Sequence, residues 1–249
     1  MTKLSAFGFL AIAGFFGVGL APGLAQGQAR SEPVSVIELF TSQGCSSCPP
    51  ADRLLKQLSE RPEVIALSFP VTYWDYLGWK DTLARPENAE RQRDYAAILH
   101  GGQVYTPELI VNGMKECVGS DLAAIDAALA ATAPLIRKEA VPFNVRLEGG
   151  RLLIETGAAP PSSPHKMGKV WVATVRRSSP VTIRGGENSG RTVTYTNVVR
   201  GLAEAGAWEG APTSYAVPRG SLPKDGDMLV VFLQTENLGP ILAASRIKE

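Results

Sequence analysis

The fold is decided by the segment VSVIELFTSQGCSSCPP at residues 34–50. Residues 34–40 are mostly apolar, apart from Ser35 and Glu38, and rich in β-branched side chains, which predicts a short buried strand. Beyond the two prolines, apolar residues follow the i, i+3, i+4, i+7 spacing of one helical face, at Ala51, Leu54, Leu55 and Leu58. A second apolar run over 64–69 predicts another strand, so the chain opens as β-α-β with a parallel strand pair.

The segment up to residue 132 continues this alternation. The features expected there are, in order, an aromatic-rich stretch over 70–81, a helix over 86–99, strands over 109–111 and 115–118, and an alanine-rich helix ending near residue 131. Asn112-Gly113 between the two strands is a strong hairpin signal. Residues 34–132 are therefore predicted to form an α/β domain of order β-α-β-α-β-β-α.

The composition changes after residue 132. Residues 133–142 carry a proline near each end and are expected to be a linker. Beyond them, short runs rich in β-branched residues predict strands over 143–147, 152–156, 170–175, 181–184, 192–199 and 228–233. Several short strands punctuated by Gly and Pro favour a sandwich-like, β-rich domain over 143–249.

The first 25 residues are expected to be a secretory signal peptide. Lys3 supplies a basic start, residues 4–20 are largely apolar, and residues 21–25 offer small side chains before a cut ahead of Gln26. The alternative is a retained membrane anchor, for which this glycine-rich apolar run is short. We expect the mature protein to be periplasmic or secreted, from a Gram-negative bacterium, with no stable membrane insertion after cleavage.

The charge balance argues against one class of partner. The chain carries 25 Lys and Arg against 24 Asp and Glu, a formal net charge of +1. Lys3 is the only charged side chain in the first 25 residues, so removing them leaves a neutral chain. A neutral protein has no long-range attraction to a polyanion, so no nucleic acid partner is expected.

The cysteines carry the chemistry that the sequence suggests. Three are present, Cys45, Cys48 and Cys117, and two residues separate the first two. In an exported protein such a pair can be a redox catalyst or a static disulfide. Two thiolates with His100 or Cys117 could instead hold a soft ion such as Cu(I), although there is no second pair with this spacing. Cys117, on a predicted strand, is expected to be a small buried hydrophobe.

Thr106-Pro107 precedes the strand predicted over 109–111. Only X-Pro bonds adopt the cis form at low cost, and we expect this one to be cis and to face Cys45. A cis bond there would expose a backbone edge on which an extended substrate segment could pair as an added strand. The alternative is an ordinary trans proline at the start of a strand.

Several motifs resemble an exported bacterial family known as domain of unknown function 1223, or DUF1223. The resemblance rests on VIELFTSQGCSSCPPAD at 36–52, YWDYLGW at 73–79, VYTP at 104–107, ENSGR at 187–191 and NVVR at 197–200. It implies a thioredoxin-like domain followed by a β-rich one. The wider thioredoxin-like superfamily implies Cys45 as nucleophile, Cys48 as resolving thiol and Pro107 as the cis-proline.

Three further residues are expected to tune the thiols. Disulfide exchange needs a thiolate, and a helix N-terminus favours an anion, so Cys45, exposed at the expected helix start, should have a lowered pKa. Ser46 and Ser47 stand where thioredoxins have Gly-Pro and add hydroxyl donors for the thiolate. Thioredoxins bury an aspartate beneath the second cysteine, and Glu38 is the nearest acid here, one residue out of register.

The aromatic-rich stretch has two interpretations. In the first, it packs as a small satellite of the hydrophobic core beneath a long loop. In the second, Trp74 and Trp79 line a substrate groove near the cysteines, together with Tyr105 and Thr106. The polar loop over 185–191 is expected to be a solvated turn.

The sequence therefore predicts an exported thiol–disulfide oxidoreductase that acts through a mixed disulfide and requires no cofactor. Its partners would be protein thiols or disulfides, together with a periplasmic or membrane redox partner. The alternative from another class is a non-catalytic exported scaffold or binding protein with a structural disulfide. A Cu(I)-binding protein is a further alternative.

Overall fold

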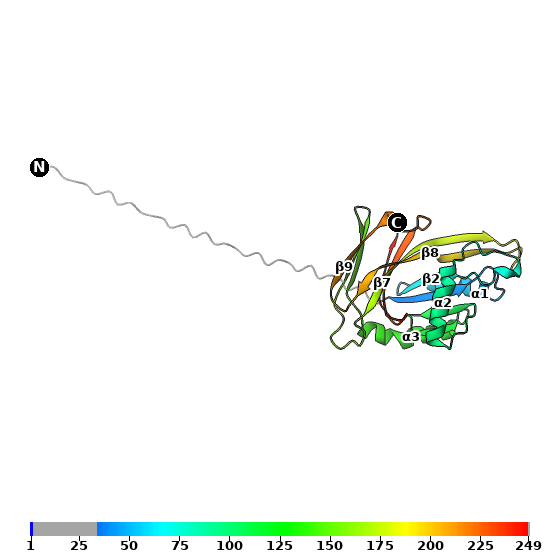
Figure 1. Ribbon diagram of the computed structural model, residues 1–249, viewed down its shortest axis with the longest axis horizontal. Coiled ribbons are helices and arrows are strands. Elements are labelled where there is room, and N and C mark those ends of the chain that lie inside the picture. The colour runs from blue at the N-terminus through cyan, green and yellow to red at the C-terminus, as the bar shows by residue number, and fades with distance from the viewer. Residues whose placement is uncertain (2–33, 249) are drawn as a thin grey trace. The chain divides into compact units, whose positions relative to one another are not determined.

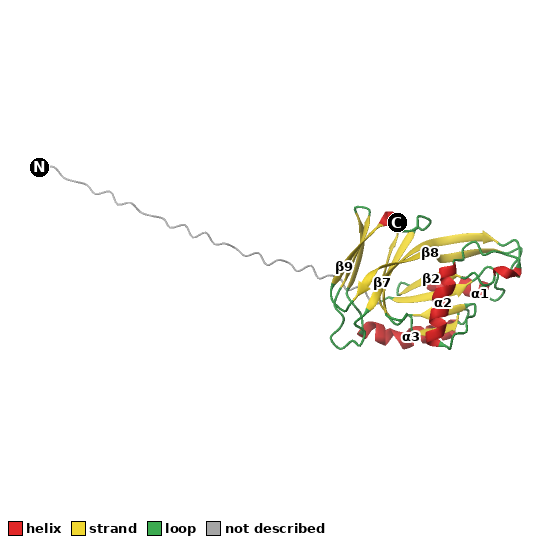
Figure 2. Cartoon of the chain, viewed as in Figure 1, coloured by secondary structure: helices red, strands yellow, loops and turns green. Residues whose placement is uncertain are grey.

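The computed structural model describes Met1 and residues 34–248 (Figures 1 and 2). The expected signal peptide, its cut before Gln26 and the alternative membrane anchor fall on residues outside this description. From residue 34 onward the described chain forms one compact unit. None of its helices has the length and apolar character needed to cross a membrane.

The order of elements predicted for residues 34–132 is confirmed. The elements are β1 Ser35–Thr41, α1 Pro49–Ser59, β2 Val64–Pro70, the 3₁₀ turn η1 Asp75–Leu77, α2 Pro86–Leu99, β3 Glu108–Val111, β4 Lys115–Val118, α3 Leu122–Lys138, β5 Phe143–Glu148, β6 Arg151–Thr156, β7 Gly168–Thr182, β8 Thr192–Trp208, β9 Thr213–Pro218, the 3₁₀ turn η2 Arg219–Ser221, β10 Met228–Thr235 and β11 Ile241–Lys248. Between residues 143 and 248 there are strands and one 3₁₀ turn but no α-helix, as the loss of helical periodicity predicts. β9 and β11 were not predicted.

Residues 34–248 have a mixed α/β fold with two sheets. Eight strands form the large sheet in the order β11-β10-β7-β8-β2-β1-β3-β4, and β5-β6-β9 form a small one. β1 and β2 are parallel, with Val36 opposite Ile65. β8 also runs parallel to β2, pairing Val198 with Ser68. The large sheet therefore contains strands from both halves of the chain.

The expected boundary between an α/β domain and a separate β-rich domain is thus not what the structure has. β7, β8, β10 and β11 extend the sheet that β1 and β2 begin. One apolar cluster joins Phe40 and Tyr95 from the first half with Phe232 from the second. The outer edge of β2 would otherwise leave backbone groups unpaired, and β8 covers it. Asn197 on β8 adds a side-chain bond there, donating to the carbonyl of Ala66 at 2.9 Å.

The expected linker over 133–142 is largely helix. α3 continues through Pro134 and ends at Lys138, about two turns beyond the predicted end. The alanine-rich body of α3 buries Ile125, Ala128 and Ile136 on one side, and this packing holds the helix past the proline.

Different layers cover the two faces of the large sheet because successive side chains of a strand point to opposite faces. On one face, α2 packs over Val36, Phe40 and their neighbours. On the other face, α1 and α3 pack over Ile37 and Leu39. The small sheet covers this second face over β7 and β10. Val172 on β7 belongs to the same apolar cluster as side chains of the small sheet.

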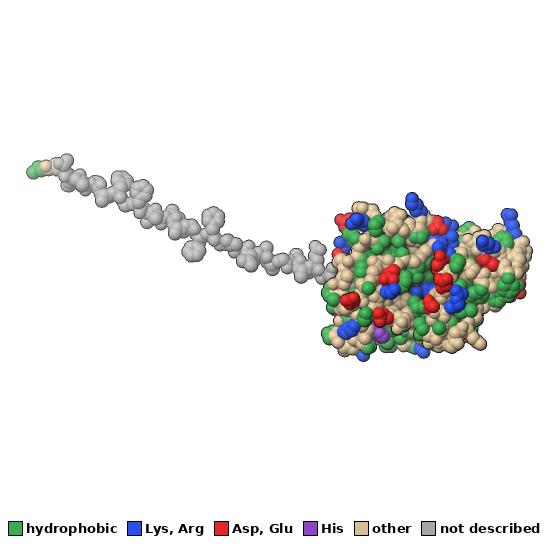
Figure 3. All heavy atoms as spheres, viewed as in Figure 1, with side chains coloured by type: hydrophobic (Ala, Val, Ile, Leu, Met, Phe, Trp, Pro, Cys, Tyr) green, Lys and Arg blue, Asp and Glu red, His purple; other side chains and the backbone are tan. Residues whose placement is uncertain are grey.

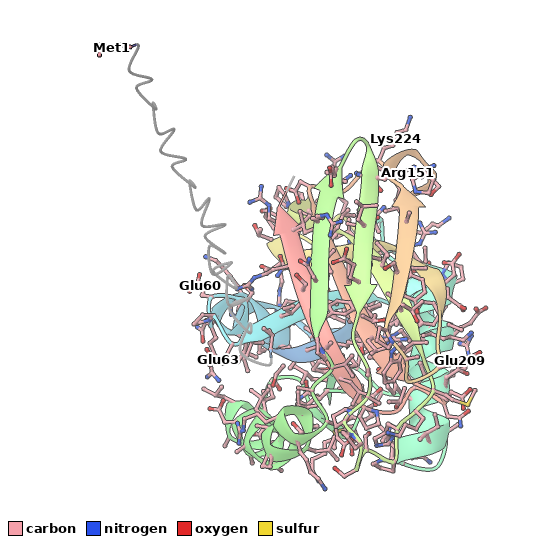
Figure 4. The ribbon with its side chains drawn as sticks, turned by 90° about the vertical axis from the view of Figure 1, so that its left-hand side faces the viewer. Met1, Glu60, Glu63, Arg151, Glu209 and Lys224 are labelled. Atoms are coloured by element: carbon pink, nitrogen blue, oxygen red, sulfur yellow. A yellow bond between two sulfur atoms is a disulfide. The ribbon has the colours of Figure 1, made fainter. Side chains whose placement is uncertain are left out.

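The outer surface of the small sheet faces the viewer in Figure 4. Arg151, the first residue of β6, and Glu209, between β8 and β9, mark its opposite ends. In the space-filling view of Figure 3, acidic and basic side chains are interspersed over the face shown. This face has no concentration of one sign of charge, which agrees with the net charge of +1.

A buried ion pair ties α2 to two strands of the large sheet. Arg91 donates to both carboxylate oxygens of Glu38, at 2.6 and 3.0 Å, and to Gln234 Oε1 at 2.9 Å. Tyr95 donates its hydroxyl to Glu38 Oε1 at 2.6 Å and accepts from Gln234 Nε2 at 2.8 Å. The side chains of Arg91 and Glu38 are 7% and 1% exposed. β1 and β10, far apart in sequence, are thus held to the same helix.

Candidate functional site

The Cys45–Cys48 pair lies in the connection between β1 and α1. The two residues form a disulfide, with their Cα atoms 5.4 Å apart. The connection is a tight turn, because the Cys48 N–H donates to the Cys45 carbonyl at 3.2 Å. α1 begins at Pro49, with Cys48 as its N-cap residue. The two prolines fit this first turn, where their missing N–H groups leave no helical bond unmade.

Two expectations about Cys45 are wrong. It precedes the N-cap residue by three positions instead of starting the helix, so the partial positive charge of the helix end lies nearer to Cys48. It is also buried, at 1% exposure, as is Cys48 at 0%. Both serines that were expected to tune the thiols are exposed. Ser47 Oγ lies 3.4 Å from Cys45 Sγ. Ser46 makes no side-chain hydrogen bond within residues 34–248.

The Thr106–Pro107 bond is cis and faces Cys45, as predicted. Cys45 Sγ lies 3.8 Å from the carbonyl oxygen of Thr106. Ser47 Oγ lies 3.5 Å from the same oxygen. The cysteine turn and the segment just before β3 therefore meet at the Cys45 sulfur.

The predicted substrate-binding residues lie in three places. Trp74 belongs with Thr106, to whose Oγ1 its indole N–H donates at 2.7 Å. Trp79 donates to Gln43 Oε1 at 2.7 Å, on the chain just before the cysteines. Tyr105 instead bonds through its hydroxyl to Glu116 on β4. Trp74 and Thr106 therefore lie together beside Cys45.

Tyr76, also part of the aromatic-rich stretch, is a further aromatic neighbour. Its ring stacks on that of Trp74, with centroids 6.3 Å apart, and the residue is 77% exposed. The pair presents an exposed aromatic surface close to Thr106.

The loop between β7 and β8 also reaches the cysteines, so the expectation of a solvated turn over 185–191 is wrong at its centre. Asn188 donates from Nδ2 to the carbonyls of Gln43 and Cys45, at 2.9 and 2.8 Å. It is 1% exposed. In Figure 1 the long β7–β8 pair extends over β2 toward the end of the sheet where α1 begins.

Two glycines let this loop pack directly on the aromatic-rich stretch. A Cβ at Gly185 would lie 2.7 Å from the carbonyl oxygen of Gly78, too close for any side chain. Gly186 has a φ of +69°, a conformation that favours glycine. A Cβ at Gly186 would lie 3.3 Å from Trp79 Cβ. The loop, the aromatic stretch and the cysteine turn form one packed layer.

Glu38 does not lie beneath Cys48, which corrects its assignment as a tuning residue. Its side chain points to the face of β1 covered by α2, where it bonds to Arg91 and Tyr95. Ile37 and Leu39, its neighbours in the strand, point to the α1 side. The alternation of the strand thus directs Glu38 away from the cysteines.

The acid on the cysteine side is Asp52, which was not assigned from the sequence. Its N–H donates to the Cys48 carbonyl at 3.1 Å, so the two residues are one helical turn apart and share a side of α1. Its Oδ1 accepts from Thr41 Oγ1 at 2.8 Å. Its Oδ2 is buried and has no hydrogen-bond partner among the residues described. Burial, reinforced by the charge of Asp81, raises the pKa of Asp52 to about 7.

Asp81 and Tyr195 complete the buried polar surroundings of Asp52. Asp81 accepts from three backbone N–H groups, among them that of Gln43 at 2.8 Å, which marks it as a structural acid. Burial raises the pKa of Tyr195, and the charges of Asp52 and Asp81 raise it further. Since Tyr195 lies on β8, the second half of the chain contributes a wall to this side of the site as well.

Cys117 is confirmed as a small buried side chain. It is 9% exposed, with Sγ 3.7 Å from the carbonyl of Leu109. Burial, with the nearby charge of Glu116, raises the pKa of its thiol to about 12. His100 pairs with Glu108 at 2.8 Å. Within the described chain, no three His, Cys, Asp or Glu side chains come together in a way that could hold a metal ion.

Comparison with known proteins identifies the relatives of this chain. The profile of a family described as "Protein of unknown function (DUF1223)" matches residues 36–234. The crystal structure of protein AGR_C_4864 from Agrobacterium tumefaciens is 34% identical, covers 88% of this chain and 96% of that one, and superposes with a TM-score of 0.76. HBP35 of Porphyromonas gingivalis, at 11% identity, has a TM-score of 0.59 over 87% of this chain and 75% of that one, a likeness of fold alone. No curated protein matches the sequence. With its family profile spanning most of the chain, this protein belongs to the DUF1223 family.

Proposed function

We propose that this protein is a thiol–disulfide oxidoreductase acting through the Cys45–Cys48 disulfide. The observation that carries the proposal is the 3.8 Å separation of Cys45 Sγ from the Thr106 carbonyl, which sets a backbone edge beside the reactive sulfur. The order β1-α1-β2-α2-β3-β4-α3, with β1 between β2 and β3, supports a thioredoxin-like arrangement of residues 34–132.

In the proposed reaction, a substrate thiolate attacks Cys45 Sγ. The new bond joins the substrate to Cys45, the Cys45–Cys48 bond breaks, and Cys48 leaves as a thiolate that takes a proton. A second substrate thiolate then attacks the substrate sulfur of this mixed disulfide and releases Cys45. The substrate gains a disulfide and the cysteine pair gains two electrons. The reverse sequence reduces a substrate disulfide, and the reduction potential of the pair decides the direction.

Asp52 is the proposed source of the proton for Cys48. A group whose pKa is about 7 holds its proton at neutral pH and releases it at little cost, which suits it to exchange protons with a thiol. Its buried Oδ2 lacks a partner within residues 34–248, so the carboxyl has an oxygen free to carry that proton.

The reduction potential of the pair tests the proposal. Equilibration of the purified protein with glutathione redox buffers, followed by thiol labelling, is expected to give a value above about −300 mV, the region of exchangeable disulfides. A value well below this, together with no exchange with glutathione, would support a structural disulfide.

The second candidate function is a non-catalytic scaffold. The observation in its favour is the burial of both cysteines, at 1% and 0% exposure, because exchange requires a partner to reach a sulfur atom. In such a scaffold the disulfide would only hold the β1–α1 connection.

We also propose that the protein is exported and acts on protein thiols or disulfides, with a periplasmic or membrane redox partner. The support is the basic, apolar and small-residue pattern of residues 3–25. N-terminal sequencing of the protein from a periplasmic fraction should give a start near Gln26. A start at Met1 in the cytoplasmic fraction would contradict export.

Replacing Asp52 with Asn is expected to change how stability depends on pH. The pKa of Asp52 is raised from an ordinary 3.8 to about 7 by burial. Between these values the folded protein binds a proton that the unfolded chain does not, so this group lowers stability by about 1.4 kcal/mol per pH unit as pH rises. The Asp52→Asn variant keeps an acceptor for Thr41 and lacks this dependence. Relative to the parent, it should gain stability from about pH 4 to about pH 7 and no more above.

Urea unfolding of the oxidised proteins at several pH values between 4 and 8 measures this difference. An Asp126→Asn variant is the matched control, since Asp126 pairs with Arg61 at the surface. Parallel stability profiles for the parent and Asp52→Asn would show that Asp52 is not a buried neutral acid, and would remove it as the proton source.

A further inference from the structure

We infer that Asn188 is a positioning residue, which holds the Cys45 turn beneath the loop over 183–191 and thereby sets how fast a thiol reaches the Cys45 sulfur. The inference deepens the proposed function and rests on it for its biological meaning. Its physical content, a change in the rate of disulfide exchange, is measured without any protein substrate.

The first observation concerns the hydrogen-bond partners of Asn188. Both of its strong contacts run from Nδ2 to backbone carbonyls of the cysteine connection, those of Gln43 and Cys45. The bond to Cys45 spans 143 residues of sequence. Its Oδ1 is buried and has no partner in the part of the chain described. A buried amide that leaves one end unsatisfied is retained for its donors, because the unpaired oxygen by itself costs stability.

The second observation is that the loop is braced by its own hydrogen bonds and by packing. Its base is closed by backbone bonds from Ile183 to Arg191 and from Gly190 to Ile183, each at 2.9 Å. Gly185 and Gly186 seat it against the aromatic-rich stretch. Ile183 is fully buried. The loop therefore transmits its position to Cys45 through the side chain of Asn188.

The third observation is the geometry that exchange requires. A thiolate attacks a disulfide at one sulfur while the other leaves, so the attacked sulfur must be accessible. Cys45 is 1% exposed, with Thr106 on one side and the loop and Asn188 on another. Attack thus needs a shift of the Cys45 turn relative to the loop. The two hydrogen bonds of Asn188 are the direct polar links that oppose this shift.

The test is the rate at which glutathione reduces the oxidised protein. Glutathione thiolate attacks Cys45, a second glutathione resolves the mixed disulfide, and oxidised glutathione and the protein dithiol are the products. The parent, Asn188→Ala and Asn188→Asp proteins are compared with Ser189→Ala, an exposed neighbour in the same loop, as the matched control. Acid quenching, maleimide labelling and mass spectrometry give the second-order rate constant.

Asn188→Ala is expected to raise the rate constant by roughly tenfold, because it removes the two hydrogen bonds that hold the Cys45 turn beneath the loop. Ser189→Ala should match the parent. Asn188→Asp keeps the shape but has no donor once its carboxyl is ionised, so it should also react faster at the alkaline end of the pH range. Its excess over the parent, compared at each pH, should shrink on acidification, because a protonated carboxyl regains one donor.

A folded Asn188→Ala variant with an unchanged rate constant would overturn the inference, as would an equal acceleration in Ser189→Ala. If Asn188→Ala does not fold, the pH dependence of the isosteric Asn188→Asp variant decides alone, and a constant ratio to the parent counts against the inference. The expected acceleration without any trapped protein partner in cells would uphold Asn188 as a positioning residue and reject the oxidoreductase proposal. Trapped protein partners without any acceleration in Asn188→Ala would support the oxidoreductase proposal and reject Asn188 as a positioning residue.

Discussion

Cells that express the Cys48→Ser variant in a Cys117→Ala background are expected to accumulate covalent protein adducts that disappear on adding reductant. Without Cys48, the mixed disulfide at Cys45 has no neighbouring thiol to displace the partner, so the reaction stops after its first step. The Cys45→Ser variant in the same background should accumulate far fewer adducts, because it removes the sulfur that lies beside the Thr106 carbonyl, where the proposed attack takes place. Non-reducing electrophoresis followed by mass spectrometry of the adducts measures the contrast.

The Cys117→Ala change removes the one other thiol that could resolve or form an adduct. A structural disulfide predicts a different pattern, in which either cysteine substitution destabilises the protein by a similar amount, typically about 2–5 kcal/mol, and neither traps a partner. Comparing the unfolding midpoints of the two variants alongside the adducts separates these cases. If neither variant forms adducts, the proposal that this protein is an oxidoreductase is rejected, and the description of the fold is unaffected.

The Arg91→Met variant is expected to lose about 3–5 kcal/mol of unfolding free energy, because it leaves the buried carboxylate of Glu38 without its cation. The side chain of Glu38 is 1% exposed and accepts two of its hydrogen bonds from Arg91. Adding Glu38→Gln to Arg91→Met should recover most of the loss, since a neutral amide can still accept from Tyr95. Urea unfolding gives the free energies.

Arg93→Met is the control for this pair of variants. Arg93 lies on the same helix but is exposed, so its replacement should change the stability by less than about 0.5 kcal/mol. A small loss in Arg91→Met, similar to that of the control, would mean that the Glu38 carboxyl is accommodated without a cation. No recovery in the double variant would mean that Arg91 acts mainly through its packing on Phe69, Tyr95 and Phe232.

Local sequence patterns were enough to predict the first half of the fold. The apolar run over 34–40 became β1, and the helical face beginning at Ala51 became the buried side of α1. Asn112-Gly113 forms the tight turn between β3 and β4, with φ values of +53° and +69°. In each case the information lies within one element or one turn, where periodicity and backbone preference act on adjacent residues.

The site was predicted where it depends on such local chemistry and missed where it does not. The cysteine pair, the cis Thr106–Pro107 bond and the nearness of Trp74 followed from motif and order. Glu38 was assigned by its distance in sequence from the cysteines, but strand alternation turns it to the opposite face. Asp52 became a candidate only once its burial and its raised pKa were known.

By itself, then, the sequence determined the β1–α1 connection with its cysteines, the order of elements through α3 and the strand character of the chain beyond residue 143. Only the tertiary structure decided that β8 pairs with β2 to make one sheet of both halves, and that Asn188 reaches Cys45 across 143 residues. The physical reason is that strand pairing and desolvation depend on which distant segments pack together. Helical periodicity, turn geometry and capping depend on neighbours in the chain, which a sequence displays directly.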